Sequence, residues 1–540
     1  MALEYTEEKL NSLDKETLIQ LFLSQQEQLK QIDHNLQLVL EQMADLKRHR
    51  FGRSTEKHEI EDQLSFMEAD GKIVFFNESE AVAAEENTQE EAENISRTKP
   101  KKKQGKREED LSGLPVVVVE HSMTDEELED KFGKDGWKQL PDEVYRRYSF
   151  TPAKIEVEEH HVKIYAGKET EEVVKAPHPQ ALLRGSLVSP SLEAAVMNAK
   201  YVNAVPLYRQ EQEFERCGLH ISRQNMANWT IQCADRYLAV LYDYLHERLY
   251  GYHVLQADET PVLVNKDGRP AGAKSFMWVY RTGRMYTDCQ IVLYEYQKTR
   301  NTSHPREFLN DFSGVCVTDG YQVYHTIEGE REDLKIAGCW SHARRRFDEA
   351  VKALPKAKQK DSRAYLALTM IQAICREEKQ LKDLPAEERK NRRQLSVKPL
   401  VEAYFAWVRE NLPKVPQKSK TWEGFNYSLN QEKYLKVFLD DGEVPMDNNA
   451  AEQSIRGFCI GKKNWVMIDT IAGAKSSAII YSIAETAKAN NLKPYDYFEY
   501  LLTEIPKHLD DTDRSFLDDL LPWSPNLPAN CRKPDKEEVK

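Results

Sequence analysis

The stretch GYHVLQADETPVLVN, residues 251–265, decides the expected fold. Within it, His253 to Ala257 predict a β-strand, and Asp258 follows at the predicted end of that strand. In open α/β sheets, ligands and catalytic groups gather where strands end. Asp258 is therefore the first candidate for a catalytic acid.

The segments that follow residues 251–265 predict an α/β fold. Two strands, in 275–283 and 285–297, precede a helix in 304–312. A fourth strand, Val315–Thr318, ends at Asp319, and a fifth in 334–340 leads into a helix. This order predicts a mixed sheet with helices on both faces. If the first and fourth strands are neighbours, Asp258 and Asp319 meet at one edge of the sheet.

A third acid stands far along the chain, in MDNNAAEQSIRG, residues 446–457. The run predicts a helix start, with Asp447 or Asn448 as its cap. Glu452 and Arg456 are one turn apart and share a face of this helix. Two strand-end carboxylates and one helical carboxylate can hold two divalent cations, an arrangement suited to phosphodiester chemistry. The chain has 89 acidic residues, so position alone leaves open whether these three belong together.

Composition bounds the possible classes of protein. A chain of 540 residues predicts two to four domains. The longest aliphatic run, Val116–Val119, is too short to span a bilayer, and the N-terminus lacks a signal pattern, so we expect a cytoplasmic location. The eight cysteines form no C-x-x-C pair. The net charge of −13 hides basic blocks at 97–107 and 331–365, so DNA binding is not excluded.

The N-terminal region predicts self-association. Apolar residues recur at heptad spacing from Leu18 to Leu46, which indicates a coiled coil, although one long helix lying on a core has the same pattern. Residues 78–110 are first acidic and then basic, as in a disordered linker. The basic part of this linker either contacts DNA or is simply solvated.

Two further regions precede the expected sheet. Residues 115–175 have strand character, for example throughout 143–167. Residues 203–237 predict two helices joined by a turn, with Ser222 capping a second helix that runs through Trp229. This outline matches either a helix-turn-helix, which would make Arg223 a candidate DNA contact, or a helical hairpin that binds nothing.

Several longer segments resemble one known family. LQADETPV, VTDGYQVY, GCWSHARRRF and DNNAAEQSIR, followed by KKNW and ETAKANNLKPYDY, closely resemble the transposases of the insertion-sequence-66 family. RFGRSTEK and VPLYRQEQEFERCGLHISRQNMANW match the same family, so the resemblance runs from about residue 10 to 505. It implies a DDE transposase with a ribonuclease-H-like catalytic core. Its catalytic, metal-binding acids would be Asp258, Asp319 and Glu452, with Mg²⁺ or Mn²⁺ as the cofactor.

The resemblance also implies supporting residues. Cys339 and His342 look like the C-x-x-H signature of several DDE superfamilies, but zinc would need two more ligands. The family usually carries a small zinc module with two cysteine pairs, whereas residues 111–175 hold no cysteine, so we expect no structural zinc. The residues expected to support the acids or to contact DNA are Cys339, His342, Arg344, Asn448, Arg456, Lys462 and Lys463.

The resulting domain prediction divides the chain into six parts. These are a coiled-coil helix (1–57), a charged linker (58–110), a small β-containing module (111–180), a helical, helix-turn-helix-like region (181–250), a catalytic domain (251–490) with a helical insertion at about 355–440, and a C-terminal helical region and tail (491–540).

The expected activity is metal-dependent cleavage at insertion-sequence ends, followed by strand transfer to target DNA. Expected partners are the terminal repeats, target DNA, further copies of the chain through the coiled coil, and accessory proteins encoded by the element; no membrane is expected. A hydrolase using Asp258 and Glu259 as acid and base is disfavoured, because adjacent strand residues point to opposite faces. A non-catalytic DNA-binding protein derived from a transposase remains the alternative.

Overall fold

The computed structural model describes three ranges of the chain, 154–166, 173–270 and 272–534, and four single residues, Val118, Asp130, Lys131 and Gly133. The predicted coiled coil and charged linker, and most of the module at 111–180, lie outside the described residues. None of the described helices combines the length and the apolar character that crossing a bilayer requires.

The described residues fall into two compact units. The smaller unit contains an antiparallel two-stranded ribbon, formed by β1 (Ile164–Ala166) and β2 (Val173–Lys175). Strand was predicted throughout 143–167, and within the described part of that range this prediction is wrong outside β1. Tyr165 and Val174 pair across the ribbon and are both exposed. A two-stranded ribbon with no buried face lacks the hydrophobic packing that would stabilise longer strands.

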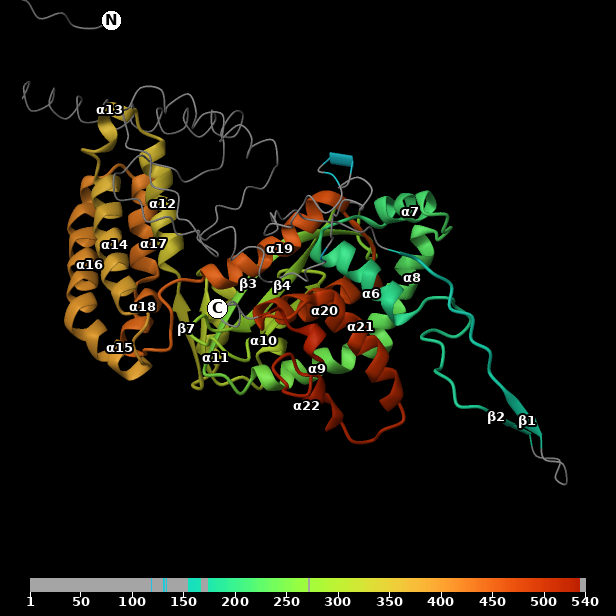
Figure 1. Ribbon diagram of the computed structural model, residues 1–540. Helices are drawn as coiled ribbons and strands as arrows, with labels where there is room; N and C mark the ends of the chain where they lie inside the picture. The colour runs from blue at the N-terminus through green and yellow to red at the C-terminus, as the bar shows by residue number, and fades with distance from the viewer. Residues whose placement is uncertain are drawn as a thin grey trace, which may run out of the picture. The chain divides into compact units, whose positions relative to one another are not determined.

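A mixed sheet organises the larger unit (Figure 1). The strand order is β5-β4-β3-β6-β7, and β8 pairs with the far part of β3. The two pairings among β3, β4 and β5 are antiparallel, whereas β3–β6 and β6–β7 are parallel. The strands are β3 (Val254–Lys266), β4 (Lys274–Thr282), β5 (Val292–Gln297), β6 (Gly314–Thr318), β7 (Leu334–Gly338) and β8 (Ile468–Thr470). The mixed α/β class expected from the sequence is confirmed, and β3 and β6 are indeed neighbours.

Alternation along the strands sends side chains into two separate cores. Leu255 and Ile336 enter one core, whereas Val254, Val317 and Ala337 enter the other. Both faces of the sheet are therefore buried, as its short apolar strands predict.

Helices cover both faces of the sheet (Figure 1). The first core is closed mainly by α20, which packs on β5, and by α21, which packs on α6. The helices associated with this core are α6 (Pro190–Met197), α8 (Arg223–Cys233), α9 (Ala239–Leu249), α10 (Ser303–Phe308), α11 (Gln322–Glu330), α19 (Asn449–Trp465), α20 (Ile471–Ala489), α21 (Pro494–Glu504) and α22 (Phe516–Leu520).

A helical bundle closes the second core, and Figure 1 shows it standing beside β7. Helix α12 packs on α14 and α17, and α14 packs on α16. The elements of the bundle are α12 (Trp340–Lys352), α13 (Lys356–Gln359), α14 (Arg363–Gln380), α15 (Ala386–Arg392), α16 (Lys398–Asn411), α17 (Lys420–Asn430) and α18 (Glu432–Leu435). All of them lie between Asp319 and Glu452 in the sequence.

The predicted pair of helices is present as α7 (Leu207–Arg216) and α8. The Ser222 hydroxyl accepts a hydrogen bond from the backbone N–H of Asn225 at 3.2 Å and caps α8, as the sequence predicts. Helix α8 continues to Cys233, so it is one turn longer than expected.

Candidate active site

Asp258 lies inside β3, so the prediction that it ends the strand is wrong. Strand β3 continues to Lys266, and its antiparallel pairing with β4 runs as far as Leu263. Pairing with β6, however, stops at Gln256, two residues before Asp258. Beyond Gln256, this edge of β3 no longer pairs with β6. Proline cannot donate a ladder hydrogen bond and is tolerated at such an edge, which is where Pro261 lies. Asp258 still lies where β6 ends, although β3 itself does not end there.

Asp319 follows the last residue of β6 and begins a tight turn. One of its carboxylate oxygens, Oδ1, accepts a hydrogen bond from the backbone N–H of Tyr321 at 2.9 Å. The Tyr427 hydroxyl donates to the Asp319 carbonyl oxygen at 2.9 Å. Gly320 adopts a φ of +91°, and a Cβ there would lie 3.0 Å from the Tyr427 hydroxyl oxygen. The turn therefore requires glycine at this position.

Glu452 lies in the first turn of α19. The Asp447 carboxylate accepts from the backbone N–H of Asn449 at 3.0 Å, whereas the Asn448 side chain makes no cap hydrogen bond. Instead, Asn448 Nδ2 donates to the carbonyl oxygen of Ala257 at 2.7 Å, next to Asp258. The helix start is thus tied directly to β3. Ala451 is fully buried, and its small side chain permits a close approach of the helix start.

The three predicted acids share one electrostatic environment. Burial raises the pKa of Asp258 well above its usual range, and the negative charges of Glu259, Asp319 and Glu452 raise it further. Glu259 forms an ion pair with Arg300, and Glu452 forms one with Arg345 at 3.0 Å. Within the described residues, neither Asp258 nor Asp319 forms an ion pair. The cluster therefore holds more negative than positive charge.

This surplus charge fits a divalent cation. Glu452 Oε1 is buried and accepts no hydrogen bond within the described part of the chain. Asp258 and Asp319 each use one oxygen to accept a backbone N–H. The donor set is made of carboxylate oxygens, which Mg²⁺ and Mn²⁺ prefer. The ligands predicted for such an ion, Asp258, Asp319 and Glu452, offer donors of this type.

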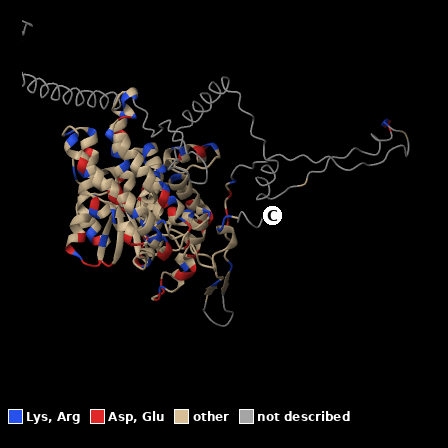
Figure 2. Ribbon diagram, turned by 90° about the vertical axis from the view of Figure 1, so that its left-hand side faces the viewer, with Lys and Arg blue, Asp and Glu red and all other residues tan. Residues whose placement is uncertain are grey.

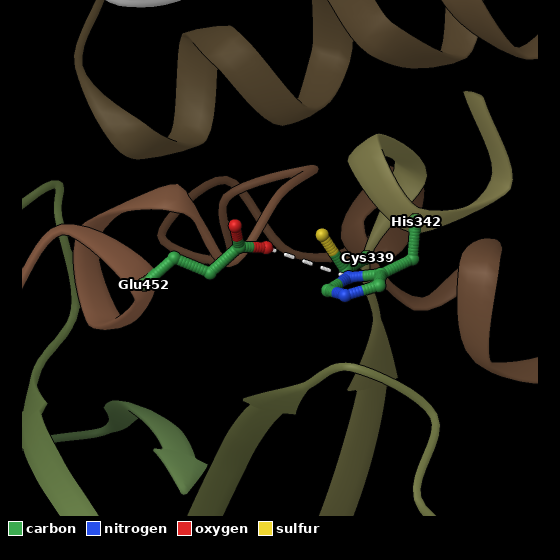
Figure 3. Close-up of side chains that lie close together, drawn as sticks. All are labelled: Cys339, His342 and Glu452. Carbon is green, nitrogen blue, oxygen red and sulfur yellow. Dashed lines mark ion pairs between the residues drawn. The ribbon is translucent and has the colours of Figure 1, made fainter. Parts of the chain in front are cut away.

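The C-x-x-H pair lies against Glu452 (Figure 3). Ligand atoms of Cys339, His342 and Glu452 all lie within 4.8 Å of one another, and His342 Nδ1 is 3.6 Å from Glu452 Oε1. Burial raises the pKa of the Cys339 thiol and lowers the pKa of His342, so both are neutral near pH 7. The thiol sulfur also accepts a hydrogen bond from the backbone N–H of Asn448 at 3.1 Å. Cys339, His342 and Glu452 supply three ligand atoms, one fewer than the four protein ligands of a structural zinc site.

Arg345, the residue after the predicted supporting residue Arg344, contacts Glu452. Arg344 borders a cavity of about 10 Å³ together with Cys375 and Asp447. Helical spacing could have found the difference: His342 and Arg345 are three residues apart and share a face of α12, whereas Arg344 does not. Arg345 Nη1 also lies 3.3 Å from His342 Nε2.

The predicted DNA contacts are spread over the larger unit. Lys462 Nζ donates to the Pro261 carbonyl oxygen at 2.7 Å, while Lys463 is exposed. Arg223 is exposed at the start of α8, with its guanidinium 5.5 Å from the ring centre of Tyr208. Arg456 is half-buried one turn after Glu452. Figure 2 shows basic and acidic residues interspersed over the helices.

Sequence reasoning missed the contacts that link Glu259, Arg300 and Tyr321. The Glu259 carboxylate, the Arg300 guanidinium and the Tyr321 ring come from β3, the loop after β5, and the turn after Asp319. No local pattern pairs these positions, because they are separated by at least 21 residues.

Known protein families match most of this chain. The family described as "Transposase IS66 family" matches residues 185–476, and the "IS66 C-terminal element" matches residues 482–523. A third family, "Transposase C of IS166 homeodomain", matches residues 39–119.

Three similar proteins come from Sinorhizobium fredii (strain NBRC 101917 / NGR234). Uncharacterized protein y4qI is 30% identical over 369 residues, which cover 67% of each chain. Uncharacterized protein y4jD is 27% identical over 65% of this chain and 69% of its own length. For uncharacterized protein y4hP the identity is 24%, over 71% of both chains.

Proposed function

This chain belongs to the IS66 family of transposases, and on that premise we propose that it is a DDE-type DNA transposase. It would cut DNA at the ends of its insertion sequence and join the freed ends to target DNA. The observation that carries this proposal is the convergence of Asp258, Asp319 and Glu452 from two neighbouring strands and a helix, with surplus negative charge among them.

We further propose that the catalytic core is ribonuclease-H-like. Three antiparallel strands, β5, β4 and β3, are followed in the sheet by the parallel strands β6 and β7, which supports this assignment. In this proposal the helices from Lys356 to Leu435 form an insertion between the second and third acids. Helices α7 and α8, together with residues 39–119, would recognise the terminal repeats. Self-association would occur through the heptad region, with accessory proteins as further partners.

Asp258, Asp319 and Glu452 would hold Mg²⁺ or Mn²⁺, which would supply positive charge to the reacting phosphate and make a bound water more acidic. In the first reaction, water attacks the phosphorus atom at the element's end. The phosphorus–oxygen bond to the 3′ oxygen breaks, and that oxygen takes up a proton to give a 3′-OH. In the second, this hydroxyl loses its proton and attacks a phosphodiester of target DNA, which releases a new 3′-OH there.

Other residues of the site would position these acids. Arg345 and His342 would keep Glu452 oriented, since one contacts Oε2 and the other lies beside Oε1. Asn448 would hold α19 against β3, because its side chain bonds both Gln256 and Ala257. Lys463, Arg456 and Arg223 would contact DNA phosphates.

Labelled DNA carrying the element's own ends tests the proposal in the presence of Mg²⁺. Cutting should occur with the unmodified chain, disappear with a chelator, and be lost in Asp319→Ala and Glu452→Ala. Glu330→Gln, which alters an exposed ion pair with Arg306, is the matched control and should cut normally. Retained cutting in Glu452→Ala would remove this residue from the site.

The second candidate function is DNA binding without catalysis, and the match of residues 39–119 to a homeodomain-like family favours it. Binding of the same labelled ends, measured by gel shift with Ca²⁺ in place of Mg²⁺, separates the two functions. A chain that binds the ends with normal affinity but never cuts them, even with the accessory proteins present, would support this alternative.

A further inference from the structure

Glu259 is a buried carboxylate that the proposed reaction does not use. Its side chain is only 2% exposed, and Oε2 accepts no hydrogen bond within the described residues. Burying a carboxylate with an unsatisfied oxygen costs stability, and an ion pair seldom repays that cost in full. Such a group in a cluster of acids therefore points to a role other than stability.

The Glu259 carboxylate holds Arg300 in one orientation. Oε1 accepts from Arg300 Nε at 2.7 Å and also from Nη2, so a single oxygen receives two guanidinium N–H groups. Arg300 belongs to the loop between β5 and α10, and its side chain is 38% exposed. Glu259 thus fixes a residue that would otherwise be mobile at the surface, because a long side chain in a loop has many rotamers.

Arg300 in turn holds Tyr321. Its guanidinium lies 3.6 Å from the centre of the Tyr321 ring, which is close cation–π stacking. The Tyr321 hydroxyl donates back to the Arg300 carbonyl oxygen at 2.9 Å. Tyr321 is therefore held at both its ring face and its hydroxyl by the same residue.

Tyr321 completes the connection to the active site, because its backbone N–H donates to Asp319 Oδ1 at 2.9 Å. Asp319 leaves its second oxygen for other ligands. A shift of Tyr321 would thus rotate the Asp319 carboxylate relative to Asp258 on the neighbouring strand.

We propose that Glu259, Arg300 and Tyr321 form a positioning bridge that orients the Asp319 carboxylate for divalent-cation binding. The proposal rests on the cation site of the proposed function. The three residues act through Asp319 and touch neither the ion nor the DNA. Partners that orient a ligand in this way are commonly worth 10- to 100-fold in metal affinity.

Mn²⁺ binding to the full-length protein, measured without DNA by electron paramagnetic resonance of the free ion, tests the bridge directly. Arg300→Ala should weaken Mn²⁺ binding by about tenfold or more. Arg300→Lys keeps a positive charge and should recover part of the loss. Tyr321→Phe removes only the hydroxyl contact and should have a smaller effect. Glu259→Gln should resemble Arg300→Ala.

The matched control is again Glu330→Gln, because Arg306 contacts Glu330 through two nitrogens, at 2.8 and 2.6 Å, away from Asp319. It should leave Mn²⁺ binding unchanged. In cleavage assays the Mg²⁺ concentration for half-maximal rate should rise in Arg300→Ala, while the rate at saturating Mg²⁺ is largely kept. A purely structural ion pair would lower thermal stability without changing this concentration.

The outcomes separate the bridge from the proposed function. If the unmodified chain binds Mn²⁺ and folded Arg300→Ala and Arg300→Lys bind it equally well, the positioning bridge is wrong and the cation site stands. If the unmodified chain binds no Mn²⁺ at millimolar concentration, both the cation site and the bridge are wrong.

Discussion

Replacing Glu193 by glutamine should remove a pH-dependent destabilisation of the packing of α6 on α8. Glu193 is fully buried in α6, and its Oε1 accepts a hydrogen bond from the Thr230 hydroxyl of α8 at 2.8 Å. Its other oxygen accepts none within the described residues. Burial raises the pKa of Glu193 from 4.5 to about 8, and the Thr230 hydrogen bond and the Lys200 charge only partly oppose this rise.

The direction of this pH dependence follows from whether the folded or the unfolded chain binds the proton more tightly. Between pH 4.5 and about 8, Glu193 is protonated in the folded chain and ionised in the unfolded chain, so folding takes up a proton. The stabilisation from the protonated group is complete below pH 4.5, is lost as pH rises, and is gone above about pH 8. Each pH unit in this window costs about 1.4 kcal/mol, so the whole window costs on the order of 5 kcal/mol.

Glu193→Gln keeps the acceptor for Thr230 and cannot ionise. Its local opening free energy should match the unmodified chain near pH 5 and exceed it by roughly 3 kcal/mol near pH 7.5. Hydrogen exchange of peptides from α6 and α8, corrected for intrinsic exchange rates, measures this difference. Exposed Glu247→Gln in α9 is the control and should show no such trend. Equal protection of the Glu193→Gln variant and the unmodified chain at pH 5 and pH 7.5 would refute the reasoning.

Three further substitutions test other parts of the structure. Arg345→Ala should lower the cleavage rate by about 10- to 100-fold, because Glu452 loses a 3.0 Å partner, while end binding in a gel shift should change little. Gly320→Ala should destabilise the chain by about 1–3 kcal/mol in urea unfolding, since φ is +91° there; an unchanged midpoint would contradict the glycine requirement. Arg393→Met should cost about 3–5 kcal/mol in the same assay, because fully buried Arg393 pairs with Glu378 and donates to three carbonyl oxygens; a loss below about 1 kcal/mol would show that the pair is dispensable.

Much of the fold was predictable from short-range patterns. The mixed sheet and the Ser222 cap follow from local signals, whereas the sequence left open whether β3 and β6 are neighbours. Alternating or apolar runs produce strands, and a serine before a helix satisfies its free N–H groups wherever the helix packs. The same approach failed for the end of β3. Whether a strand continues past Asp258 depends on its partner β4, which pairs with it as far as Leu263.

The sequence by itself determined the family, the three candidate acids and the order of strands and helices. Only the tertiary structure decided that Arg345 contacts Glu452, that Asn448 ties α19 to β3, and that Glu259 is joined to Arg300. The physical reason is the separation along the sequence between the residues that interact. Periodicity and capping depend on residues within a few positions of each other, whereas these contacts join residues 41 to 191 positions apart. The packing of the two cores determines which of these residues meet, and no local pattern in the sequence indicates the pairs.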